Sequence, residues 1–131
     1  MIYDLRTYTL KPRSVPAVEK MFEEAMPTRT KYSPLGGFFH TDVGPLNQIV
    51  HIWQYKDADE MQRVRTEAAA DPSGMWPPKG LAAHMAIQSS ELIVPAPFME
   101  DWDGPQKLGE LYELRIYDLV AGTRPEVMKA W

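Results

Sequence analysis

The sequence predicts an α+β domain of the ferredoxin-like type, with two helices on one face of a four-stranded antiparallel sheet. Two observations lead to this prediction. Strand-like and helix-like segments follow one another in the order βα-ββ-αβ along residues 1–97, which is the split βαβ pattern. Part of the opening unit also recurs after residue 110, which indicates a second copy of the same domain.

Composition fits a globular domain and narrows the range of partners. The chain has 131 residues, 44% hydrophobic and 24% charged, with a net charge of −4 and no cysteine. Without a basic run we expect no nucleic-acid binding, and without a long apolar stretch we expect no membrane insertion. The missing cysteines exclude disulfides and thiolate ligands. No signal peptide precedes the first strand, so a cytoplasmic location is expected.

The first βα unit is defined by an alternating segment and a helical stripe. Residues 2–10 read as a strand that stops at Pro12. Ser14 is a suitable N-cap and Pro16 fits the first turn of a helix. Pro27 is expected to weaken or kink that helix. Apolar side chains recur at helical spacing, namely Val15, Val18, Met21, Phe22, Ala25 and Met26.

The next two strands should pair as a hairpin. Phe38–Val43 follows a Gly-Gly punctuation and alternates as a strand. Gly44–Asn47 has turn composition, and Gln48–Tyr55 reads as the third strand. Because the connection is short, we expect the two strands to lie antiparallel and adjacent.

The second half of the domain begins with a capped helix. Asp57 followed by Glu60 forms a capping-box pattern, and Asp71-Pro72 ends the regular part of the helix. Residues 72–80 are rich in proline and glycine and predict an irregular connection. A short helical turn at residues 80–84 then leads into a fourth strand over Ala86–Val94.

The internal repeat is the most specific pattern in the chain. When residues 112–131 are placed under residues 3–22 without a gap, eight of the twenty positions are identical. We therefore expect a domain at residues 1–97, a linker at 98–109 and the start of a truncated second repeat at 110–131. Alternatively, residues 110–131 form an added strand and a stub helix on the first domain. The identical pairs are Tyr3/Tyr112, Leu5/Leu114, Arg6/Arg115, Tyr8/Tyr117, Leu10/Leu119, Pro16/Pro125, Val18/Val127 and Lys20/Lys129.

Several segments together resemble the NIPSNAP family. They are Tyr3–Pro12, Gly37–Thr41, Gly44–Asn47, Val50–Tyr55 and the helix end Ala70-Asp71-Pro72. The resemblance implies a dimeric α+β barrel, in which two such sheets face each other. The chain itself is therefore the expected partner, as a homodimer or a larger symmetric assembly. Many family members carry glycine in the turn after the first strand, where this chain has Arg13 and its second copy has Gly122.

Strand alternation groups four candidate ligand-binding residues. Arg6 and Tyr8 share one face of the first strand, and His51 and Trp53 share one face of the third. The second copy has Leu114 and Ile116 at the positions of Leu5 and Thr7, which suggests that the leucine face meets the helices. Arg6, Tyr8, His51 and Trp53 would then point into the barrel and hold a small acidic or polar molecule. Alternatively, Arg6 pairs with Asp4 and the aromatics only fill space.

Two classes of function stay open. The first is a small-molecule or protein binding domain in the NIPSNAP fold. The second is a cofactor-independent enzyme, similar to a monooxygenase or an isomerase, acting on a small organic acid or aromatic in the barrel. No catalytic residue can be assigned, and no cofactor is expected. Three scattered histidines without His-x-x-x-His spacing argue against a metal site.

Overall fold

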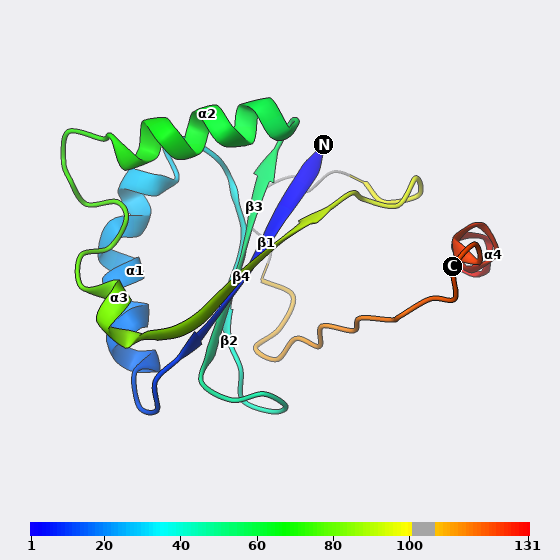
Figure 1. The fold of residues 1–131 in the computed structure, drawn as a ribbon, viewed down its shortest axis with the longest axis horizontal. Coiled ribbons are helices and arrows are strands. Elements are labelled where there is room, and N and C mark those ends of the chain that lie inside the picture. Colours follow the sequence, from blue (N-terminus) through cyan, green and yellow to red (C-terminus); the bar gives the residue numbers. More distant parts are fainter. Residues whose placement is uncertain (101–106) are drawn as a thin grey trace.

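The computed structural model describes residues 1–100 and 107–131. In this part of the chain one antiparallel sheet contains four strands in the order β2-β3-β1-β4 (Figure 1). The strands are β1 (Ile2–Leu10), β2 (Leu35–His40), β3 (Gln48–Tyr55) and β4 (Met85–Ile93). The four-stranded antiparallel sheet and the βα-ββ-αβ order predicted from the sequence are confirmed.

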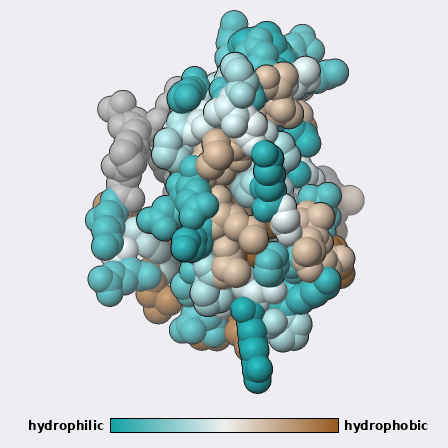
Figure 2. Space-filling view, turned by 90° about the vertical axis from the view of Figure 1, so that its left-hand side faces the viewer, coloured by the Kyte–Doolittle hydropathy of each residue, from teal (hydrophilic) through white to brown (hydrophobic). Residues whose placement is uncertain are grey.

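The helices of the domain lie on one face of this sheet. Figure 1 shows α1 (Val15–Arg29), α2 (Ala58–Ala69) and the short α3 (Leu81–His84) on the same side. Their outward surface is mostly hydrophilic, with a few pale-brown patches (Figure 2). Within the described residues, none of the helices has the length and apolar character that crossing a bilayer requires.

Local signals account for the starts of both long helices. Ser14 occupies the N-cap of α1 but makes no side-chain capping bond, and the helix runs through Pro27 to Arg29. At α2 the Asp57 carboxylate accepts the N–H of Glu60 at 2.8 Å. The Glu60 carboxylate accepts the N–H of Lys56, one residue before the cap, at 2.6 Å. The expected capping box is therefore present with its second bond displaced by one residue.

The second strand begins earlier than the sequence suggested. The expected span was Phe38–Val43, whereas β2 covers Leu35–His40. Gly36 and Gly37 were read as a break, but they belong to an edge strand whose register with β3 shifts between Leu35 and Gly37. Glycines are tolerated at such an irregular edge because one side of the strand has no partner to match.

Two clusters of buried side chains fill the space between sheet and helices. The first contains Tyr8, Leu10, Val18, Phe22, Ile49 and Leu81. The second contains Trp53, Tyr55 and Val64. Trp76, from the proline-rich connection between α2 and α3, packs against both clusters. The core therefore lies on the helix side of the sheet, and the 72–80 connection is part of its cover.

The C-terminal residues leave the sheet on the side away from the helices (Figure 1). Residues 110–120 are extended without strand pairing, and α4 (Arg124–Ala130) follows them. The Tyr112 ring lies 5.1 Å from the ring of Phe39 on β2, measured between centroids. The middle of the expected linker, residues 101–106, lies outside the described residues. That residues 110–131 open a second repeat stays a prediction.

Arg13, in the turn after β1, and Gly122, which the predicted repeat aligns with it, both have a positive φ. Arg13 has a φ of 67°, and Gly122, the equivalent residue 109 positions later, has a φ of 89°. Positive φ values suit glycine because a Cβ crowds the backbone there. Arg13 therefore holds a glycine conformation at a steric cost.

Replacing Arg13 by glycine should stabilise the protein. We expect Arg13→Gly to raise the free energy of unfolding by about 0.5–1 kcal/mol, because relief of the Cβ strain exceeds the greater freedom that glycine gives the unfolded chain. Urea unfolding measures the change. Arg13→Ala is the matched control, because it removes the charge and keeps the Cβ. Equal stability of the two variants would contradict a backbone origin.

Candidate functional site

The four candidate residues do lie on one face of the sheet. Arg6 on β1 is the direct cross-strand neighbour of His51 on β3, and His51 is in turn the neighbour of Phe38 on β2. Tyr8 and Trp53 are two residues further along their strands in the same parity. The expectation that alternation brings these side chains together is therefore confirmed.

The face itself was assigned wrongly. The four residues were expected to point away from the helices, but Tyr8 packs with Val18 and Phe22 of α1. The His51 ring also lies 5.3 Å from the Phe22 ring, centroid to centroid. The repeat could not decide the matter, because apolar residues stand on both faces of β1. Large rings bury more apolar area against the helices than the smaller side chains of the other face.

His51 is buried in a fixed tautomer. Its side chain is 1% exposed, and its Nδ1 accepts the indole N–H of Trp53 at 2.7 Å. A neutral imidazole that accepts at Nδ1 carries its proton on Nε2. That Nε2 has no hydrogen-bond partner among the described residues. His51 therefore presents one unused N–H donor inside the core.

Burial sets the charge state of His51. Desolvation lowers its pKa from 6.5 to about 3, and the nearby positive charges of Arg6 and Arg29 act in the same direction. The imidazole is therefore neutral around pH 7. It can donate a hydrogen bond, but acid–base catalysis near neutral pH, which the sequence left open, would need a different pKa.

Asp4 and Arg6 form a loose buried pair. The Asp4 side chain is 0% exposed, and its Oδ1 accepts the hydroxyl of Ser90 at 2.5 Å. Its Oδ2 lies 4.0 Å from Nη1 of Arg6. Neither that Oδ2 nor the Nε of Arg6 has a hydrogen-bond partner among the described residues. The alternative in which Asp4 pairs with Arg6 is thus realised as an ion contact that leaves polar atoms of both residues unused.

Arg29 is a site residue that the sequence analysis missed. Its guanidinium donates to Ser33 Oγ at 2.8 Å and to Tyr55 Oη at 2.7 Å. It also lies 4.1 Å above the Trp53 ring and 5.5 Å from that of Trp76. The signal was available: Arg29 follows Ala25 by four positions and so continues the buried stripe of α1. The expected disturbance at Pro27 led us not to extend the buried stripe as far as Arg29, whereas α1 runs through Pro27 to Arg29.

The cluster carries more positive than negative charge. Arg29 is 2% exposed, and in the described part of the chain no carboxylate lies within ion-pair distance of it. Burial lowers the pKa of its guanidinium. Arg6 and Arg29 supply two positive charges, Asp4 supplies one negative charge, and His51 is neutral. The interior between α1 and the sheet therefore favours an anion.

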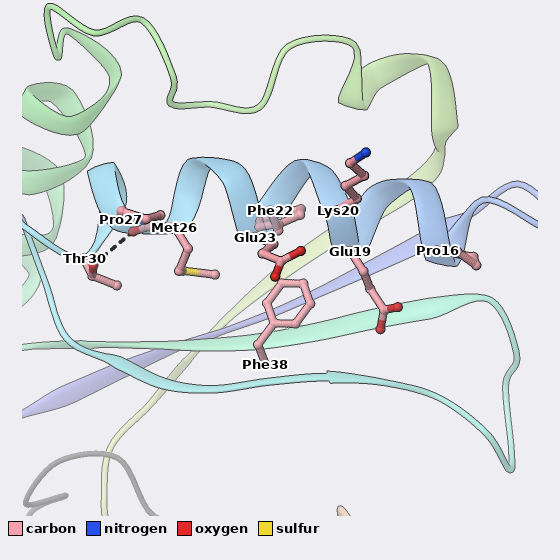
Figure 3. Close-up of a pocket in the computed structure, with 9 residues that line it drawn as sticks. All are labelled: Pro16, Glu19, Lys20, Phe22, Glu23, Met26, Pro27, Thr30 and Phe38. Carbon is pink, nitrogen blue, oxygen red and sulfur yellow. Dashed lines mark hydrogen bonds between the residues drawn. The ribbon is translucent and has the colours of Figure 1, made fainter.

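A surface groove approaches this cluster between α1 and the edge strand β2. Its volume is about 730 Å³, and the Phe38 side chain rises from β2 toward Phe22 and Glu23 of the helix (Figure 3). His40, also on the helix side of β2, contacts Glu19 of α1 at 2.6 Å. Within the described residues, no three histidine, aspartate or glutamate side chains lie close enough together to hold a metal ion.

Comparison with known proteins points to one family. The NIPSNAP family model matches residues 3–100. A NipSnap homolog of Dictyostelium discoideum is 32% identical over 94 residues, covering 72% of this chain and 42% of the relative. Human NipSnap homolog 3A is 29% identical over 126 residues, covering 93% and 49% respectively. The chain thus spans about half the length of the curated relatives it matches.

Solved structures agree with this assignment. A crystal structure of an uncharacterized NIPSNAP domain protein from Burkholderia xenovorans matches with a TM-score of 0.71 and 31% identity, covering 77% of this chain and 100% of that one. A putative antibiotic biosynthesis monooxygenase from Nitrosomonas europaea matches with a TM-score of 0.56 and 11% identity, covering 72% and 98%. The second likeness concerns the fold alone.

The depressed pKa of His51 makes the fold sensitive to mild acid. Below pH 6.5 the unfolded chain takes up a proton on this histidine that the folded protein refuses until about pH 3. Stability should therefore fall as the pH drops, by about 2 kcal/mol between pH 7 and pH 5. Urea unfolding across this range measures the slope.

His51→Gln tests the origin of that slope. A glutamine carbonyl can still accept the Trp53 indole N–H but does not titrate, so the variant should lose most of the fall between pH 7 and pH 5. His40→Gln is the control and should retain the fall, because His51 is still present. An unchanged slope in His51→Gln would assign the acid sensitivity to other groups.

Proposed function

The chain belongs to the NIPSNAP family, and from that premise we propose that it is a binding domain for a small anionic molecule, assembled as an α+β barrel. One observation carries the binding proposal. Asp4 Oδ2, Arg6 Nε and His51 Nε2 are buried on adjacent strands and have no hydrogen-bond partners among the described residues. Two of these atoms, Arg6 Nε and His51 Nε2, are N–H donors, and leaving each of them unpaired costs about 1–3 kcal/mol, so an anionic molecule that accepts from both would recover this cost. Asp4 Oδ2 is an acceptor and is not paired by such a molecule.

The site is matched to an acid. Nε of Arg6 and Nε2 of His51 both offer N–H donors, and the excess positive charge supplied by Arg29 favours a carboxylate near them. Tyr8 and Trp53 form apolar walls on either side of His51, with ring centroids at 4.8 Å and 6.0 Å from the imidazole. Binding at this position lies between helix and sheet, and not in the space between two sheets.

The other face of the sheet supports the proposed assembly. The helices cover only the core side (Figure 1). By strand parity the opposite face carries the partly or fully exposed apolar side chains of Val50, Ile52 and Ile87. A second copy of the chain that covers this face would remove apolar surface from water at about 25 cal/mol per Å². For relatives about twice as long as this chain, we propose that a second repeat of the same chain covers this face in place of a second copy.

An enzymatic role is the second candidate. The fold shared with a putative antibiotic biosynthesis monooxygenase is the observation that favours it. A neutral His51 without a free acceptor on Nδ1 argues for binding without proton transfer, because a general base needs a lone pair that the substrate can reach. Turnover of a bound acid would decide in favour of the enzyme.

Arg6→Met tests the binding proposal. Methionine keeps an unbranched apolar stem in place of the arginine stem and removes both the charge and the Nε donor. Calorimetry against a panel of aliphatic and aromatic carboxylates should find a compound that binds the parent protein, with affinity lowered about tenfold or more in Arg6→Met. Arg63→Met, on the exposed face of α2, should bind as the parent does. If the parent binds none of the panel, Arg6 is structural and the proposal fails.

A charged substitution tests the assembly. Light scattering at micromolar concentration should find a dimer of the parent chain. Val50→Glu places a carboxylate on the covered face and should yield a monomer, because burying an unpaired charge costs several kcal/mol. Thr66→Glu, on the outer surface of α2, should remain dimeric. A parent chain that is monomeric at this concentration would count against a homodimer.

A further inference from the structure

The groove between α1 and β2 ends on the rings that cover His51. Phe22 and Phe38 lie 5.0 Å apart, and the centroid of each is within 6 Å of the imidazole, at 5.3 Å and 5.9 Å. Figure 3 shows Phe38 standing between the strand and the helix at the middle of the groove. A single aromatic layer therefore separates the groove from a histidine that is 1% exposed and has an unused Nε2–H.

Phe38 is the member of this layer that can move. Phe22 is 1% exposed and is fixed in the helix, whereas Phe38 is half-buried and belongs to the edge strand. Its strand contains Gly36-Gly37 directly before Phe38 and has an irregular register between Leu35 and Gly37, so the backbone next to Phe38 lacks side chains that would pack it against the helix. Rotation of the Phe38 side chain toward solvent would join the groove to the buried cluster.

The space that Phe38 would leave is flat. Its ring is stacked on His51 with an interplanar angle of 21°, and the Phe22 ring bounds the same space from the helix side. An aromatic ring fits a slot of this shape and keeps the contacts that Phe38 gives up. The remaining groove is lined largely by apolar groups, including Met26, Pro16 and Pro27.

The positive charge of Arg6 and Arg29 indicates where the second end of a ligand, an anionic head group, would lie. Arg6 is the next residue beyond His51 in the same cross-strand row, and it retains an unpaired Nε–H. The Arg29 guanidinium adds a second positive charge that no carboxylate of the described residues pairs with directly. The groove is lined by Glu19, Glu23 and Lys20 of α1, and the Glu19 carboxylate contacts His40. An anionic head group would have to pass these carboxylates before it reaches the positive interior.

We propose that the α1–β2 groove is the entrance and the aromatic subsite of this protein, with Phe38 as its gate, and that the molecule it takes is a planar aromatic carboxylate. The inference rests on the proposed function and adds the class of ligand and its route. The aromatic ring occupies the position of Phe38 against His51 and Phe22. The carboxylate reaches the Arg6 row of the sheet.

Association kinetics with 2-naphthoate test the gate. Phe38→Ala removes the ring that must rotate, so stopped-flow binding should be about tenfold faster than with the parent protein. Phe38→Trp enlarges the gate and should slow association. Phe39→Ala is the matched control, because the adjacent residue points to the opposite face of the sheet and contacts Tyr112. If Phe38→Ala does not fold, Phe38→Leu takes its place.

The outcomes separate the two proposals. Naphthoate binding that depends on Arg6 and becomes faster in Phe38→Ala supports both. Naphthoate binding with an association rate that is unchanged in the Phe38 variants overturns the gate and leaves the anion site standing. Binding of cyclohexanecarboxylate as tight as that of naphthoate overturns the flat subsite. If no carboxylate binds the parent at all, the proposed function fails, and the further inference fails with it.

Discussion

A buried guanidinium needs hydrogen-bond and ring partners inside the protein, because it has lost its contacts with water. The contacts that Arg29 makes in this way fix the position of α1 on the sheet. The two terminal nitrogens of Arg29 donate to Ser33 and to Tyr55 of β3, and its flat face lies on Trp53. These contacts join the last turn of α1 to the centre of the sheet. The helix can therefore continue past Pro27, where its own hydrogen bonding is interrupted, because its last turn is held from below.

The same arrangement explains why the core holds polar atoms at all. A sheet face built only from apolar side chains would pack without unpaired donors. Here Asp4, Arg6 and His51 occupy neighbouring positions on the two central strands, and each keeps one atom without a partner. Burial, helped by the two nearby guanidinium groups, lowers the pKa of His51 and keeps the imidazole neutral, so the cluster combines positive charge with hydrogen-bond donors. Such a combination is a cost to folding that a bound acid would offset.

The sequence was most informative where a single local rule decides the structure. Strand alternation, the helical stripe of α1 and the Asp57 cap predicted the order of the elements, and the bounds of β3 agree to the residue. The sequence was less informative where the structure depends on which of two surfaces packs against the helices. Both faces of β1 carry apolar residues, so alternation grouped Arg6 with Tyr8 correctly and could not tell which face the helices would choose. Arg29 was missed because charge is normally read as exposure, and only its tertiary contacts reveal a buried cation.

The indoles of Trp53 and Trp76 on one guanidinium have a consequence for how the sequence can change over evolutionary time. Arg29, Trp53 and Trp76 come from a helix, a strand and a proline-rich connection. They depend on one another because the guanidinium of Arg29 contacts both indole rings. Loss of Arg29 would leave the Tyr55 hydroxyl and the Trp53 indole without their partner. Loss of either indole would remove a ring that packs on the Arg29 guanidinium. Substitutions here should therefore be inherited as sets, so that a lineage keeps the whole group or replaces it with an apolar one.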